Sequence, residues 1–215
     1  MAKNKLSSTA TRRKFLGGAA VAGVATIAMP QVSRAQTVTW KYQSTWPTKD
    51  IFHDDAVDYA KKVNEMSGGR LKIDVLPSGA VVKAFDLIDA VNKGTLDGGH
   101  GVSAYWYGKN SAYSLFGTGP SFGMDANTLL AWYEYGGGKD LYAELHKIMN
   151  FDVVGFLYGP MPTQPLGWFK KQVKSAADFK GLKFRTVGLS VDVFKEMGAS
   201  VVALPGGEIV PALDR

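Results

Sequence analysis

The chain has 215 residues, with 25 Lys and Arg against 19 Asp and Glu, and it contains no cysteine. The absence of cysteine excludes disulfides, thiolate nucleophiles, iron–sulfur centres and Cys-based zinc sites. The formal net charge of +6 would favour an acidic partner only if the basic residues belonged to the folded protein.

The first 35 residues are predicted to be an export signal. A twin-arginine pattern at 11–16 precedes an apolar, Gly- and Ala-rich run at 17–29, and small residues suit cleavage after Ala35. An N-terminal membrane anchor is the alternative, but the run falls short of the ~20 residues that span a bilayer. Six basic residues and no acidic one lie in this signal, so the mature chain holds 19 of each sign. It therefore carries no basic excess for nucleic acid.

The first half of the mature chain alternates between strand and helix patterns. The expected order is a strand at 37–44, a helix at 50–67, a strand at 71–75, a helix at 82–93 and a short strand near 96–99. Alternation turns Val38, Trp40 and Tyr42 inward. The spacing of the first helix predicts a core stripe of Phe52, Ala56, Tyr59, Ala60, Val63 and Met66. This order predicts an α/β fold with a mainly parallel sheet, in which ligands bind beyond the carboxyl ends of the strands.

Three consecutive aromatic residues, Tyr105, Trp106 and Tyr107, follow the short strand near 96–99. Their place just past the carboxyl end of a strand favours a ligand-facing role for at least one of them. Packing at the rim or in the core explains them equally well, because aromatic side chains most often serve cores.

The second half continues the same alternation. Helices are expected at 127–135 and 140–150, the second with a core face of Leu141, Leu145, Ile148 and Met149. After these helices we expect an apolar strand at 151–158 and a Gly- and Pro-rich crossing segment at 159–165. The remaining elements are a capped turn at 175–178, a strand at 182–186, a helix at 190–197, a strand at 201–204 and a further helix from 206. The last helix is expected to continue in a longer architecture, because it forms half of a strand–helix repeat.

No enzyme motif stands out in the sequence. The three histidines include no pair at helical spacing, and nucleophile elbow, Walker loop and dinucleotide fingerprint patterns are absent. Two polar residues remain as candidates. Arg185 lies in an apolar strand, where its planar fork suits a carboxylate, although a solvated surface strand is the alternative. Gln164, in the crossing segment, is either a ligand residue or a polar turn residue.

The ordered set of motifs resembles the DctP-type solute-binding proteins of tripartite ATP-independent periplasmic (TRAP) transporters, nearest to the branch that binds 2-oxo or 2-hydroxy monocarboxylates with a metal ion. The residues that carry the resemblance are Trp46-Pro47, the run 105–109, the glycines at 136–138, and the runs 163–169, 181–185 and 206–213. The resemblance implies two α/β lobes around a cleft: lobe I at 36–150, and the crossing segment with the start of an incomplete lobe II at 151–215. It implies that Arg185 holds the substrate carboxylate, and that Gln164 coordinates both the substrate and a sodium or calcium ion. Trp46 and either Tyr105 or Trp106 would wall the pocket.

The function that the resemblance implies is a periplasmic binding subunit without catalytic activity. It would deliver a small organic acid anion to integral-membrane permease subunits, and family precedent allows a homodimer of the full-length protein. The turn at 159–163 departs from the Gly/Asn/Thr-rich turn of the 2-oxo-acid binders, so the resemblance leaves the acid unnamed. The alternatives are a periplasmic enzyme exported in folded form and a non-functional truncated product.

Overall fold

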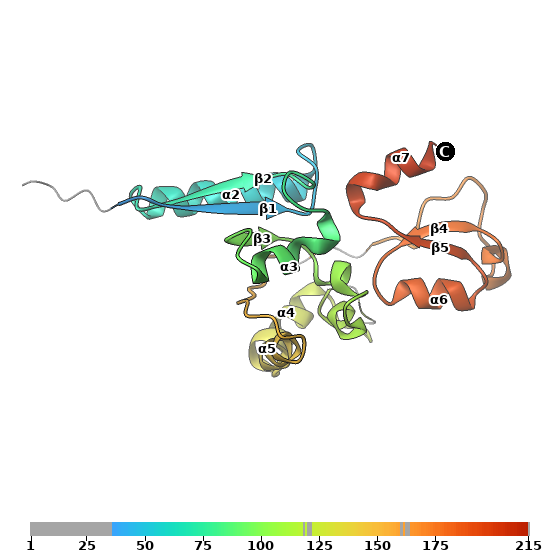
Figure 1. Cartoon of the computed structure of the whole chain (residues 1–215). Helices are drawn as coiled ribbons and strands as arrows, with labels where there is room; N and C mark the ends of the chain where they lie inside the picture. The colour runs from blue at the N-terminus through green and yellow to red at the C-terminus, as the bar shows by residue number, and fades with distance from the viewer. Residues whose placement is uncertain (1–35, 118, 120–121, 160, 162–163, 215) are drawn as a thin grey trace, which may run out of the picture. The chain divides into compact units, whose positions relative to one another are not determined.

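A three-stranded parallel sheet forms the first part of the fold (Figure 1). The computed structural model describes residues 36–117, 119, 122–159, 161 and 164–214, so the predicted export signal lies outside the described residues. The strand order is β2 (Leu71–Leu76), β1 (Val38–Ser44), β3 (Gly98–His100). Helix α2 (Ile51–Met66) connects β1 to β2, while η1 (Ala84–Asp86) and α3 (Leu87–Asn92) connect β2 to β3. The predicted parallel α/β arrangement is therefore confirmed.

The expected inward face of β1 is wrong for its first half. Val38 and Trp40 are 53% and 40% exposed, whereas Gln43 and Ser44 are fully buried. The register explains the difference, because β3 pairs with β1 only from Tyr42 onward. Among the described residues, the first half of β1 therefore has β2 as its only neighbouring strand, and the buried part of this sheet is its carboxyl end.

The predicted core stripe of helix α2 is confirmed at Ala56 and Ala60 and wrong at Tyr59 and Met66. Asp50 caps the helix by accepting a hydrogen bond from the Phe52 N–H at 2.9 Å. Its buried residues are His53, Ala56 and Ala60, while Tyr59 and Met66, both expected in the core, are exposed. Small side chains at 56 and 60 bring the helix close to the sheet, which leaves the larger residues at the rim.

A helical region follows the first sheet. It consists of η2 (Ser103–Trp106), η3 (Ser111–Phe116), α4 (Ala126–Tyr135) and α5 (Gly138–Ile148). Its core cluster contains the buried Ile88, Tyr113 and Leu145, with Tyr142 and Phe116 packed against it. The predicted core face of α5 is wrong at Leu141 and Ile148, which are 52% and 64% exposed. Tyr142 takes their place because the neighbouring core is built from aromatic rings that it contacts.

The apolar segment 151–158 was expected to be a strand, and this expectation is wrong. Phe151 and Val153 pack against the cluster of Ile88, Tyr113 and Leu145, but the segment joins no strand ladder. Val154 and Phe156 are 83% and 81% exposed. The alternation of apolar side chains is real, yet a strand also requires a neighbouring backbone to which it can hydrogen-bond.

A second parallel sheet is built from β4 (Lys183–Thr186) and β5 (Ser200–Ala203), joined by α6 (Ser190–Glu196). The turn η4 (Ala176–Phe179) precedes it and has the predicted capping box. After β5 come η5 (Gly206–Glu208) and α7 (Ile209–Leu213). Four phenylalanines, Phe169, Phe179, Phe184 and Phe194, form its aromatic core, with ring centroids 4.5 to 5.9 Å apart.

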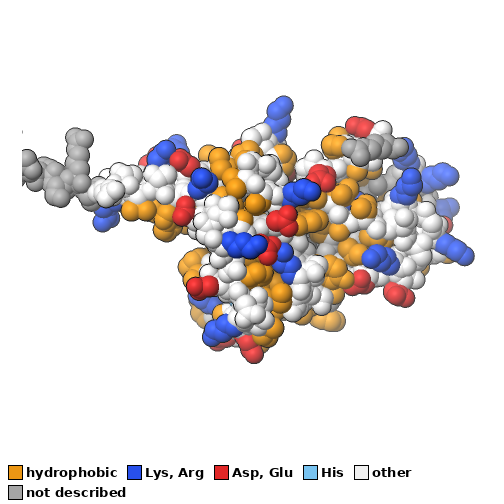
Figure 2. All heavy atoms as spheres, viewed as in Figure 1, with side chains coloured by type: hydrophobic (Ala, Val, Ile, Leu, Met, Phe, Trp, Pro, Cys, Tyr) orange, Lys and Arg blue, Asp and Glu red, His pale blue; other side chains and the backbone are white. Residues whose placement is uncertain are grey.

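The surface mixes charges of both signs with apolar side chains. Figure 2 shows acidic and basic groups interspersed with hydrophobic ones over the face in view. This agrees with the equal numbers of basic and acidic residues after the predicted signal. Within the described part of the chain, no helix combines the length and the apolar character needed to cross a membrane.

Candidate functional site

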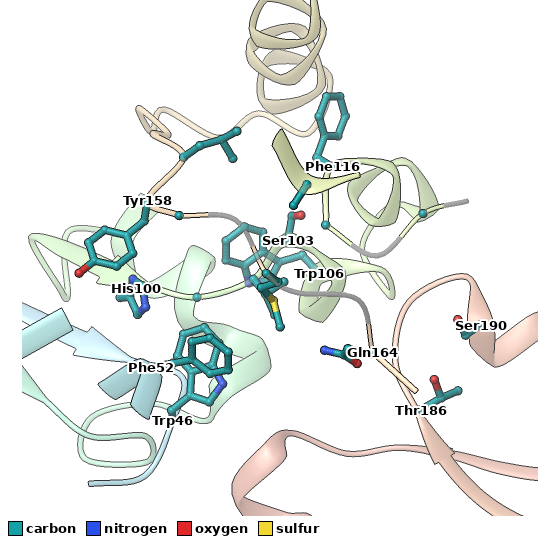
Figure 3. Close-up of a pocket in the computed structure, with 18 of the residues that line it drawn as sticks. Trp46, Phe52, His100, Ser103, Trp106, Phe116, Tyr158, Gln164, Thr186 and Ser190 are labelled. Carbon is teal, nitrogen blue, oxygen red and sulfur yellow. The ribbon is translucent and has the colours of Figure 1, made fainter. Parts of the chain in front are cut away.

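A large open cavity of about 2160 Å³ lies beyond the carboxyl ends of β1 and β3 (Figure 3). Its lining comes from those strand ends, from η2, from the segment 152–173 and from β4. Four predicted site residues line it: Trp46, Trp106, Gln164 and Arg185. The volume exceeds the ~300–1,000 Å³ of a typical small-molecule site, so a small acid would occupy only part of it.

The loop after β1 is fixed by a buried serine. Ser44 Oγ donates a hydrogen bond to the Trp46 carbonyl at 3.0 Å and accepts one from the Trp46 N–H at 3.2 Å. The same hydroxyl lies 2.8 Å from Nδ1 of His53 on α2. These bonds hold Trp46, which is 7% exposed, against Phe52, and the centroids of the two rings lie 5.1 Å apart. Sequence reasoning placed Trp46 in the pocket wall but missed Ser44 and His53, whose roles depend on contacts across the fold.

His100, at the end of β3, is a further cavity residue that the sequence did not single out. Its ring centroid lies 5.0 Å from that of Trp46 and 4.8 Å from that of Tyr158, the latter edge-to-face. Its Nε2 is buried and has no hydrogen-bond partner among the described residues. Burial lowers the pKa of His100, with a small further contribution from His53, while Asp55 opposes the shift. The ring is therefore neutral at pH 7.

Arg185 brings a cation to the cavity from the second sheet. It lies in β4 opposite Val202 of β5. Its Nε and Nη2 both donate to the carbonyl oxygen of Leu204, at 2.8 and 2.5 Å. Burial lowers the pKa of Arg185, and the Tyr105 hydroxyl opposes that shift. Arginine stays charged at neutral pH, so the N–H groups not used by Leu204 remain available to an anion.

Tyr105 and Trp106 are neighbours in η2 with different surroundings. Trp106 lines the large cavity, and its indole packs edge-to-face on Tyr113 with centroids 5.8 Å apart. Tyr105 does not line that cavity; it is 8% exposed and borders a smaller one of about 430 Å³. Its hydroxyl accepts a hydrogen bond from the Gly206 N–H at 3.0 Å. Of the two aromatic candidates for the pocket wall, the geometry favours Trp106.

Gln164 lines the cavity and is exposed (Figure 3). In the parts of the chain that the structure describes, no group of three or more His, Cys, Asp or Glu side chains could hold a metal ion. Calcium takes six to eight oxygen ligands, and the Gln164 amide offers one.

Comparisons with known proteins place this geometry in context. The chain is 40% identical over 214 residues to a monocarboxylate 2-oxoacid-binding periplasmic protein of Nostoc sp. PCC 7120, covering 95% of this chain and 57% of that protein. A TRAP transporter solute-binding protein of Bordetella bronchiseptica, solved with calcium and picolinate, matches with a TM-score of 0.77 and 35% identity, covering 83% of this chain and 53% of the other.

A second solved structure is the TRAP periplasmic solute-binding protein of Pseudoalteromonas atlantica with bound sodium and pyruvate. It matches with a TM-score of 0.74 and 36% identity, covering 84% of this chain and 54% of the other. The chain thus spans about half the length of the relatives it matches. Residues 42–215 match the family described as bacterial extracellular solute-binding protein, family 7 (DctP). Because this match takes in most of the chain, the protein belongs to the DctP family of solute-binding proteins.

Proposed function

We propose that the protein captures a small 2-oxo or 2-hydroxy monocarboxylate in the periplasm and delivers it to the membrane permease of a TRAP transporter. The observation that carries the proposal is the Arg185 guanidinium on the wall of the cavity, held in place by Leu204 and retaining free N–H groups. The names of the relatives support the substrate class, because they record a 2-oxoacid-binding protein and complexes with pyruvate and picolinate.

Arginine is the side chain best suited to this task. Its planar fork matches a carboxylate, and its charge persists in a partly desolvated site where a lysine would deprotonate more readily. The two bonds to Leu204 orient the fork before a ligand arrives. Less side-chain entropy is then lost on binding, which favours affinity.

The other predicted residues would support this anchor. Trp46 and Trp106 supply apolar walls that exclude water, and Gln164 supplies an amide to the solute and to a sodium or calcium ion like those bound by the relatives. Tyr105, outside the lining, acts as a positioning residue, because its hydroxyl interacts with Arg185 and binds Gly206. The relatives are solute-binding proteins, which supports a non-enzymatic role at the level of the family.

The two-lobe boundaries, the twin-arginine route and the homodimer remain predictions from the sequence. The hinge closure of two lobes on the acid belongs to the same proposal. Of the alternatives, neither the exported enzyme nor the truncated product is favoured by a feature of the described site.

The test is calorimetric titration of the full-length protein with pyruvate and lactate. We expect Arg185→Ala to weaken binding about 100-fold or more, because it removes a charge-assisted, partly buried contact. Lys180→Ala is the matched control: it removes an exposed cation that precedes the same strand and lies outside the cavity lining, so it should leave the affinity within about twofold. Equal affinity of wild type and Arg185→Ala would remove Arg185 from the site, and a wild type that binds neither acid would overturn the proposed substrate class.

A further inference from the structure

His100 is a half-buried polar residue of the cavity, with a buried Nε2, that the carboxylate anchor does not use. It ends β3 in the first sheet, whereas Arg185 lies in β4 of the second sheet. Figure 3 shows His100 next to Trp46 and Tyr158, while Gln164 lies near Thr186 in another region of the cavity. The two polar regions therefore lie on different parts of the cavity wall.

The orientation of the imidazole is fixed from several directions. Trp46 and Tyr158 flank the ring, and the His100 carbonyl accepts a hydrogen bond from the Thr45 N–H at 2.9 Å. Tyr158 is itself held, since its hydroxyl donates to the Asp55 carbonyl at 2.5 Å. A side chain held in this way is preorganised for a directional contact.

Two buried polar atoms near the ends of β1 and β3 are unpaired within the described part of the chain. His100 Nε2 and Thr45 Oγ1 are both buried, and neither has a hydrogen-bond partner among the described residues. Thr45 is fully buried at the end of β1, beside β3. Buried polar groups in folded proteins are nearly always paired, so a guest that supplies a hydrogen bond here would satisfy a group that is otherwise left unsatisfied.

The chemistry of the site indicates an uncharged guest. The ring is neutral, and Asp55 lies close enough to influence it, so a second carboxylate would be repelled rather than attracted. A hydroxyl both donates and accepts hydrogen bonds, so it pairs with a neutral imidazole whichever nitrogen carries the proton.

We propose that His100 is a specificity-determining residue that hydrogen-bonds a hydroxyl group on the tail of the bound acid. This inference rests on the proposed function, because it assumes that Arg185 holds the carboxylate. The preferred solutes are then monocarboxylates with a hydroxyl group beyond the second carbon, rather than acids with an apolar tail. Such acids gain one neutral hydrogen bond over their unsubstituted counterparts, which corresponds to about a tenfold gain in affinity.

The experiment compares 2-oxo acids of three to five carbons with their terminally hydroxylated counterparts, starting with pyruvate and hydroxypyruvate. Binding to the full-length protein is measured by calorimetry for wild type, His100→Phe and His146→Phe. Phenylalanine preserves the ring contacts with Trp46 and Tyr158 and removes both nitrogens. His146→Phe is the comparison variant, because it makes the same change in a second histidine that lines the cavity and packs on Tyr113 and Tyr142.

We expect wild type and His146→Phe to prefer at least one hydroxylated acid about tenfold. His100→Phe should lose that preference while it binds the unsubstituted acids normally. Pyruvate binding without any hydroxyl preference in the wild type would overturn this inference and leave the proposed function intact. Loss of all acid binding in the wild type would overturn both.

If His100→Phe fails to fold, NMR of the wild-type protein provides a second readout. The imidazole Cε1 proton resonance of wild-type His100, assigned through His100→Gln, should shift on addition of the preferred hydroxylated acid and much less on addition of its unsubstituted counterpart. Equal shifts with both acids would overturn the contact.

Discussion

Gln43 shows how one side chain can determine the path of a loop. It is fully buried near the end of β1, and its Oε1 accepts hydrogen bonds from the N–H groups of Val81 at 2.8 Å and Val82 at 3.1 Å. Its Nε2 donates to the Val82 carbonyl at 2.8 Å. The amide thus satisfies three backbone groups of the loop that leads into η1. An apolar side chain could not do this, because it forms no hydrogen bonds.

Replacing Gln43 by methionine should lower the free energy of unfolding by about 2–4 kcal/mol, because methionine keeps the volume but leaves these three backbone groups unpaired. Urea denaturation followed by circular dichroism measures the change. The matched control is Thr39→Val on the exposed half of β1, for which a change within about 0.5 kcal/mol is expected. Equal stability of Gln43→Met and wild type would show that water replaces the amide without cost.

The sequence could not reveal that Gln43 is fully buried or that Nε2 of His100 is buried. Alternation along β1 placed its apolar residues inward, yet the buried polar residues come last, where β3 covers the strand. The strand pattern left Arg185 open between a ligand residue and a solvated cation, and its proposed role came from the family resemblance. Tyr105 and Trp106 could not be separated in advance, since the path of a short 3₁₀ turn decides which ring meets which cavity.

At the level of elements, β3 begins with two glycines, at positions 98 and 99, where neighbouring side chains leave no space for a Cβ atom. A Cβ atom on Gly99 would lie 2.7 Å from a methyl carbon of Leu87, which is 2% exposed on α3. A Cβ atom on Gly98 would lie 2.1 Å from the Tyr42 ring on β1. The two glycines therefore allow the helix and the central strand to approach β3 closely.

Gly99→Ala should destabilise the protein by about 1–3 kcal/mol, because the new methyl group overpacks against the buried Leu87. Thermal unfolding measures the loss. Gly108→Ala serves as the control: it faces open space and needs no unusual backbone conformation, so it should be tolerated. A Gly99→Ala variant as stable as Gly108→Ala would mean that α3 shifts freely.

Elements with a local cause were predicted more accurately than elements that need a distant partner. The turn at Ser175 formed as expected because Asp178 accepts hydrogen bonds from the Lys174 and Ser175 N–H groups, all within five residues. The segment 151–158 has an equally clear pattern, but a strand depends on a second backbone that its own sequence does not specify. The buried faces of helices were predicted with intermediate accuracy, because the neighbouring element decides which side of a helix is buried.

Across the whole molecule, two histidines with buried ring nitrogens link stability to pH. Burial lowers the pKa of both His100 and His146, and both ring nitrogens of His146 lack hydrogen-bond partners within the described residues. In the unfolded chain the pKa of histidine is about 6.5. Below that pH the unfolded state binds protons that the folded state does not, so the free energy of unfolding falls as the pH drops toward the lowered folded values.

We therefore expect the melting temperature to fall by several degrees between pH 7 and pH 5, and to change little between pH 7 and pH 8. Differential scanning fluorimetry across this range measures it. The double variant His100→Phe, His146→Phe should show a flatter profile above pH 5. A wild-type melting temperature that is constant down to pH 5 would contradict the prediction. Asp125 and Asp178 have lowered pKa values and contribute only in a separate, more acidic range.

The strand order of the first sheet has a kinetic consequence. Its central strand, β1, comes first in the chain, and both of its partners follow within one continuous stretch that ends at His100. Each partner is reached through a single short crossover, so the loops that must close are small and their entropic cost is low. The wall that carries Trp46 and His100 can thus assemble early, before β4 delivers Arg185. Folding would then proceed from the half of the cavity that holds Trp46 and His100 to the half that holds Arg185.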